Sequence, residues 1–129
     1  MSRYITRAYH VNPEAPLSRW KKVLLWVVIA IFAFLFLAAG VNKLTSHPSI
    51  TENFVGWGYA PWFLLLIGVV EVAGAVALLI PRLARFGGYA LILVMFGAAF
   101  THIRAGEWPN PIFNLVFATG LWWVARNRS

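Results

Sequence analysis

The sequence predicts an all-α integral membrane protein, a single four-helix up-down bundle with both termini in the cytoplasm. Composition is the first observation: 60% of the 129 residues are hydrophobic and 12% are charged, whereas soluble domains are about half apolar and about one quarter charged. The second is a series of four apolar runs, of which three have lengths that fit the hydrocarbon core of a bilayer and the fourth is shorter. The third is that basic residues gather at alternate ends of these runs, as they do around membrane spans.

The N-terminal part contains a basic arm and the first expected span. Residues 1–22 are basic and contain two prolines, so we expect a cytoplasmic arm on an anionic lipid surface, with Ser18 as N-cap of the next helix. Residues 23–43 form the first span. A cleaved signal peptide is the alternative interpretation, because a basic leader, an apolar run and small residues follow in that order.

The second span, residues 62–80, has a carboxylate at its centre, Glu71. An ionised side chain at the bilayer midplane costs about 2.5–3.5 kcal/mol on insertion scales. Gly68 and Gly74 share the helix face of Glu71, and small residues let a neighbouring helix approach closely. We therefore expect Glu71 to point into the bundle and to have a functional role. A neutral Glu71 that serves only as a packing contact is the alternative.

The remaining segments follow from cap signals and apolar runs. Between the first two spans, Ser49 and Glu52 have the spacing of a capping box, which predicts a short interfacial helix that ends near Val55. The other expected segments are a third span, a fourth span and a cytoplasmic tail: residues 85–103, 112–125 and 126–129.

Basic residues set the expected orientation. One side of the membrane receives most of them, whereas the other has Lys43 and Arg104, offset by Glu52 and Glu107. Since cytoplasmic loops carry the excess of Lys and Arg, the basic side is cytoplasmic, and we expect a bacterial inner membrane. Orientation thus accounts for the net charge of +7, and no nucleic-acid partner is expected. The basic side comprises Arg3, Arg7, Arg19, Lys21, Lys22, Arg82, Arg85, Arg126 and Arg128.

The absence of cysteine limits the chemistry of the chain. Thiol exchange, thiolate metal sites and cysteine-ligated iron–sulfur clusters all require a Cys sulfur. His102 is the single histidine expected inside a span, so the pattern does not resemble a haem site, and no metal site is expected. A redox role would therefore use a bound organic molecule, such as a quinone, or a partner protein.

Three ionisable side chains project from different expected spans: Lys43, Glu71 and His102. With the neutral Asn42 and Asn114 they form the candidate ligand-binding set, which suits a proton relay or a pocket for ligand oxygen atoms; no catalytic residue is assigned. From depth along the helices we expect His102 to hold Glu71, with Lys43 roughly 10 Å away. The alternatives are a Lys43 that reaches the outer interface and a His102 that is simply a buried hydrogen-bond donor.

Three motifs occur in the order typical of one family. FLAAGVNKL resembles the small-Gly-x-x-Lys-Leu end of the first helix in DoxX-like membrane proteins, and FVGWGYAP resembles their Phe–Gly–aromatic–Pro lead into the second. LIGVVEVAGAVALLIPRLARFGGY is similar to their Gly-x-x-Glu-x-x-Gly helix with its Arg-containing turn. The resemblance covers about residues 23–125, and the matching positions are Gly40, Lys43, Glu71 and Gly74.

The resemblance implies a compact four-helix membrane protein that is often part of a redox system. Our leading hypothesis is a non-catalytic or weakly catalytic accessory subunit, which binds a quinone-like or other small apolar molecule and serves a redox protein partner. The alternatives are a structural or chaperone-like helix bundle and, less favoured, a proton-coupled transporter. All three hypotheses stay open, because fold does not determine function. A homo-oligomer is compatible with each of them.

The expected orientation can be tested with single cysteines in this cysteine-free chain. A cysteine at Ser49 should react with a membrane-impermeant thiol reagent added to intact cells, whereas one at Ser129 should react only after the membrane is opened. The reverse labelling pattern would invert the orientation.

Overall fold

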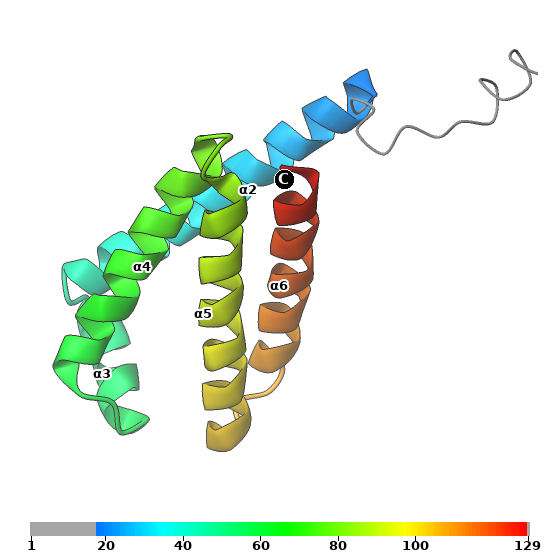
Figure 1. Ribbon diagram of the computed structural model, residues 1–129. Helices are drawn as coiled ribbons and strands as arrows, with labels where there is room; N and C mark the ends of the chain where they lie inside the picture. Colours follow the sequence, from blue (N-terminus) through cyan, green and yellow to red (C-terminus); the bar gives the residue numbers. More distant parts are fainter. Residues whose placement is uncertain (1–17, 129) are drawn as a thin grey trace, which may run out of the picture.

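The computed structural model describes residues 18–128, which fold into five helices joined by short connections (Figure 1). Their bounds are α2 Arg19–Leu44, α3 Pro48–Gly56, α4 Pro61–Leu79, α5 Ala84–Ala105 and α6 Asn110–Asn127. The all-α class is confirmed for this range. Each expected span corresponds to one long helix, and Ser18 is the N-cap residue of α2, although its side chain makes no cap hydrogen bond. Most of the expected basic arm, residues 1–17, lies outside the described residues.

Within the described range, three helices are long and apolar enough to cross a membrane: α2, α4 and α5. α6 has 18 residues but is not among them. It carries more polar side chains along its length, including Asn114 and Thr119. A fourth span therefore stays a prediction.

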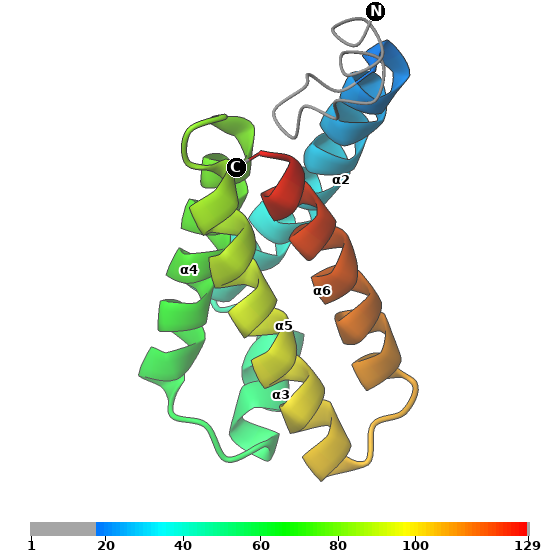
Figure 2. The ribbon, with the colours of Figure 1, turned by 45° about the vertical axis from the view of Figure 1, so that its right-hand side comes forward.

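The four long helices alternate in direction, so helices adjacent in sequence pack side by side (Figures 1 and 2). α2 packs mainly on α4, and α5 packs mainly on α6. These two pairs join through α4 and α5, whereas α2 and α6 touch only lightly. α3 lies at the end of the bundle opposite the C-terminus (Figure 2). Two tightly packed helix pairs thus leave room between them at one end.

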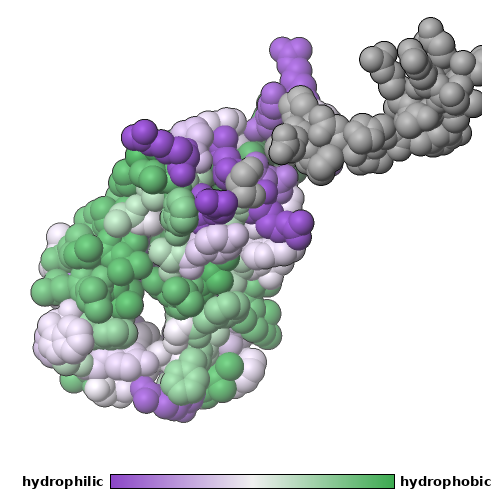
Figure 3. Space-filling view, in the orientation of Figure 1, coloured by the Kyte–Doolittle hydropathy of each residue, from purple (hydrophilic) through white to green (hydrophobic). Residues whose placement is uncertain are grey.

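The apolar core fills the other end of the bundle. Its largest fully buried side chains are contributed by all four long helices: Ile29, Leu78, Leu91, Leu121 and Val124. Apolar side chains also cover much of the outer surface over the helices, and hydrophilic ones gather at the two ends (Figure 3). An apolar surface of this extent is what a lipid environment requires.

Glycines create the closest helix contacts. A Cβ at Gly40 would lie 2.7 Å from Val72 Cγ2 and 2.8 Å from the Gly68 carbonyl oxygen, so α2 and α4 meet backbone to backbone. A Cβ at Gly87 would likewise lie 2.8 Å from the Gly74 carbonyl oxygen, where α5 crosses α4. The small-residue face expected on α4 is therefore confirmed, and it serves two neighbours.

The short helix between the first two long helices is present, but the capping box expected for it is wrong. α3 begins at Pro48 with His47 as its N-cap, so Ser49 already lies in the first turn. The Ser49 hydroxyl is 2.9 Å from His47 Nδ1 instead of capping a backbone amide. Proline favours the first helical position because it lacks the N–H that would be unsatisfied there, and this preference outweighs the serine signal.

The Gly40 contact predicts how α2 responds to one added methyl group. Gly40→Ala should lower the free energy of unfolding by about 1–3 kcal/mol, as overpacking does, because backbone atoms of α4 block the new Cβ. Gly56→Ala is the matched control, since nothing lies within 4 Å of its Cβ position. SDS titration of both purified variants measures the difference, and an unchanged Gly40→Ala would disprove the close crossing.

Candidate functional site

A cavity of about 800 Å³ lies between the two helix pairs, at the end of the bundle that carries α3. Its volume is in the range of small-molecule sites, and most of its lining is apolar. The surface is visibly hollowed in this region, between α4 and α5 (Figure 3). The polar side chains in its wall come from several elements: Lys43, Tyr59, Glu71, Thr101, His102 and Asn114.

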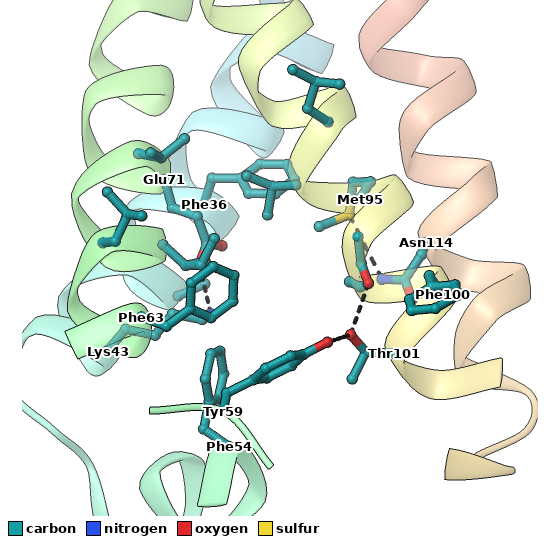
Figure 4. A pocket seen from close by; sticks show the side chains of 18 of the residues that line it. Phe36, Lys43, Phe54, Tyr59, Phe63, Glu71, Met95, Phe100, Thr101 and Asn114 are labelled. Carbon is teal, nitrogen blue, oxygen red and sulfur yellow. Dashed lines mark hydrogen bonds and ion pairs between the residues drawn. The ribbon is translucent and has the colours of Figure 1, made fainter. Parts of the chain in front are cut away.

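Lys43 and Glu71 form an ion pair in the wall made by α2 and α4 (Figure 4). Lys43 Nζ lies 2.6 Å from Glu71 Oε1, and only 16% of the lysine side chain and 3% of the glutamate side chain are exposed. Gly68 makes the contact geometrically feasible, because a Cβ there would lie 3.0 Å from the Cβ of Lys43. The close crossing of α2 and α4 therefore brings both charges to the same place.

This geometry overturns two sequence-based expectations. Glu71 is paired with Lys43 and not with His102. The expected separation of roughly 10 Å for Lys43 is also wrong, and so is a Lys43 that reaches only the outer interface. The depth estimate assumed that the end of the first span and the start of the second lie at the same level. In the structure the last turns of α2 lie opposite the middle of α4, because Gly40 packs against Gly68 and Val72, and the lysine side chain covers the remaining distance.

His102 belongs instead to a cluster at the α3 end of the cavity. Its Nδ1 lies 2.8 Å from Glu107 Oε1, and the same oxygen accepts a hydrogen bond of 3.0 Å from Trp57 Nε1. Arg104 adds a third connection by donating from Nη2 to the Trp57 carbonyl oxygen at 2.7 Å. These contacts join the α3–α4 connection to the end of α5 at this end of the cavity. The interpretation of His102 as a hydrogen-bonding residue is the better one.

Tyr59 and Thr101 bridge the same two elements inside the cavity. Their hydroxyl oxygens are 2.6 Å apart, and Thr101 Oγ1 donates to the Gly97 carbonyl oxygen at 2.9 Å. A hydroxyl has a single hydrogen, so Tyr59 must be the donor to Thr101. The Tyr59 oxygen then keeps its lone pairs for another group, and Figure 4 shows it reaching across the cavity.

Asn114 faces the cavity from the second turn of α6, opposite the ion pair (Figure 4). Its Nδ2 donates to Met95 Sδ at 3.7 Å. Its Oδ1 is buried and has no hydrogen-bond partner among the described residues. Asn42, by contrast, is exposed and does not line the cavity. Four of the five candidate residues thus surround one cavity, and Asn42 is not brought to it.

Sequence reasoning missed the aromatic and hydroxyl side chains at the α3 end. Trp57 and Tyr59 lie within the FVGWGYAP motif, which indicated only a turn into the second span. A useful signal was available there, because Trp and Tyr carry a polar atom that usually finds a partner when buried. Over residues 18–128 no group of three His, Cys, Asp or Glu side chains could hold a metal ion. The site can therefore hold an organic molecule through apolar contact, hydrogen bonds and one ion pair.

Comparison with known proteins agrees with the motifs. The model of the DoxX-like family matches residues 27–124. A protein of Bacillus subtilis (strain 168), named "Uncharacterized protein YdgD", is 32% identical over 85 residues, which is 63% of this chain and 72% of that protein. No solved structure matches.

The ion pair predicts a strong dependence between two substitutions. Lys43→Met leaves Glu71 without its partner, and removing one member of a buried pair costs about 3–5 kcal/mol. Adding Glu71→Leu should restore most of this loss, because a packed apolar pair is often as stable as a buried ion pair. Unfolding of the single and double variants by SDS titration gives the coupling free energy. Lys22→Met, at an exposed position of α2, is the control, and additive effects would show that the two charges do not interact.

Proposed function

The chain belongs to the DoxX-like family of membrane proteins, and we propose that it is a non-catalytic accessory subunit that binds a small, apolar, quinone-like molecule for a redox protein partner. The observation that carries this proposal is the cavity of about 800 Å³ with its apolar wall and a few polar atoms on facing sides. An apolar ring and tail would be buried against α4, α5 and α2. The oxygen atoms of the ligand would meet the polar side chains.

The role of a partner follows from the residues of the chain. The sequence has no cysteine, and the polar side chains of the cavity are carboxylate, ammonium, amide, imidazole, indole and hydroxyl groups, none of which undergoes the reversible two-electron reduction of a quinone. Electrons would therefore reside on the ligand. A redox protein in the same membrane would deliver or remove them.

The way into the cavity supports a ligand that arrives from the bilayer. Leu66 of α4 and Leu93 and Phe100 of α5 line the cavity and are also exposed, by 48%, 71% and 63%. Exposed apolar side chains around an opening suit contact with lipid tails better than contact with water. In the opposite direction, toward α3, the cavity is bordered by the polar cluster around Glu107.

The proposed setting is a bacterial inner membrane. In this arrangement α6 is the fourth span, α3 lies at the outer surface, and both termini are cytoplasmic. Two features support it: α6 packs along α5 as a full helix of the bundle, and most basic residues of the described range lie where α2 begins, where α4 joins α5 and where α6 ends, all at the end opposite α3. The cytoplasmic arm, bundle and tail at 1–22, 23–125 and 126–129 remain part of this proposal.

A structural or chaperone-like bundle is the second candidate, and a specific observation favours it. The Lys43–Glu71 pair lies directly beside the Gly40–Gly68 crossing, where it also fixes how α2 and α4 align. A polar pair in a bundle can serve this purpose without a ligand. The two candidates differ in what the cavity contains after mild extraction.

Narrowing the cavity opening should distinguish the ligand-binding candidate from the structural one. Gly97 lines the cavity, and nothing lies within 4 Å of its Cβ position, so Gly97→Trp should fold normally while it obstructs the opening. We expect mass spectrometry of detergent-purified wild-type protein to show a co-purified apolar molecule in stoichiometric amount, and Gly97→Trp to lose at least nine tenths of it, roughly a tenfold loss of affinity.

Ala73→Trp provides the control, since Ala73 is exposed on α4 and does not line the cavity. It should retain the molecule at the wild-type level. An empty wild-type protein, or equal retention in both tryptophan variants, would favour the structural candidate.

A further inference from the structure

We infer that the ligand carries a hydroxyl group that donates a hydrogen bond to Asn114 Oδ1, so that the site prefers a hydroxyl-bearing ring over its oxo counterpart. This inference rests on the proposed function and names the chemical class of the ligand. For a quinone-like molecule, the preferred form is the reduced hydroquinone.

First, the side chain of Asn114 has a hydrogen-bond acceptor without a partner among the described residues. An amide side chain has two N–H hydrogens and a carbonyl oxygen with two lone pairs. The nitrogen points toward Met95 Sδ, at 3.7 Å, and the oxygen is buried without a partner among the described residues. The opposite orientation of the amide would place the oxygen against the lone pairs of the sulfur. A buried carbonyl that lacks a hydrogen bond is uncommon in folded proteins and unfavourable.

The second step is that the cavity wall supplies no hydrogen for this oxygen. The Thr101 hydroxyl hydrogen goes to the Gly97 carbonyl oxygen, and the Tyr59 hydroxyl hydrogen goes to Thr101. Lys43 lies on the facing wall beside Glu71. The donor that satisfies Asn114 must therefore come with the occupant of the cavity.

The third step is the balance of donors and acceptors across the cavity. The Trp57 indole N–H is directed to Glu107, so it does not serve the ligand. On the side of the cavity that carries Asn114, the atoms left over are acceptors: Asn114 Oδ1 and the Tyr59 hydroxyl oxygen. The ammonium group of Lys43 lies on the facing wall, where it pairs with Glu71. The ligand group next to Asn114 is therefore a donor, because a ligand carbonyl there would leave both oxygen atoms without a hydrogen.

The test compares a decyl-substituted hydroquinone, kept reduced with dithionite, with the matching decyl-benzoquinone. The chain has no cysteine, so the reductant leaves the protein unchanged. Binding to the full chain in nanodiscs is measured by equilibrium dialysis. We expect the hydroquinone to bind about tenfold more tightly, as one additional hydrogen bond implies.

Asn114→Leu should remove this preference by weakening hydroquinone binding about tenfold, with benzoquinone binding changed less than about twofold. Asn42→Leu is the matched control, since it makes the same substitution at an exposed asparagine outside the cavity, and it should keep the preference. If Asn114→Leu does not fold, Asn114→Ala replaces it, and the ratio measured on the wild type already decides the inference.

The outcomes distinguish the inference from the function on which it rests. Equal affinities, or tighter binding of the benzoquinone, would overturn the hydroxyl preference and leave a ligand-binding cavity. Retention of neither probe by the wild-type protein would overturn both.

Discussion

The contact between Gly40 and Gly68 is the constraint on which the rest of the bundle depends. Because neither residue has a Cβ, α2 crosses α4 at backbone distance, and Lys43 is carried to the side of Glu71. Without this crossing, a carboxylate that is almost fully buried would have no counter-charge. The attraction within the pair offsets part of the free energy that it costs to remove the two charges from water.

The two ends of the bundle are stabilised by different kinds of contact. At the end opposite α3, large apolar side chains from all four long helices fill the interior. Near α3, an aromatic cluster of Phe54, Trp57, Tyr59 and Phe63 is joined by hydrogen bonds between connections. Glu107 holds both Trp57 and His102 there, and Tyr59 meets Thr101. Directional contacts of this kind can support an open cavity, because they fix the ends of helices without filling the space between them.

Sequence patterns predicted the helices and most of the site because these features depend on local order. Apolar runs marked the long helices, the spacing of Gly68, Glu71 and Gly74 marked a packing face, and the family motifs marked Lys43. The partner of Glu71 could not be found in this way, because it depends on which turns of α2 and α4 face each other where the two helices cross. Asn114 and Asn42 illustrate the same limit, since equal side chains near helix ends have unequal positions relative to the cavity.

Exposed apolar side chains at the edge of the cavity affect the apparent affinity for a ligand. A solute that enters between Leu66 and Leu93 first dissolves in the membrane, and its concentration there exceeds its aqueous concentration by the partition coefficient. Occupancy then follows the ratio of solute to lipid, and a weak intrinsic interaction is sufficient for a filled site. Under the proposed function, the protein would sample the redox pool of its membrane continuously, and its occupancy would follow the composition of that pool.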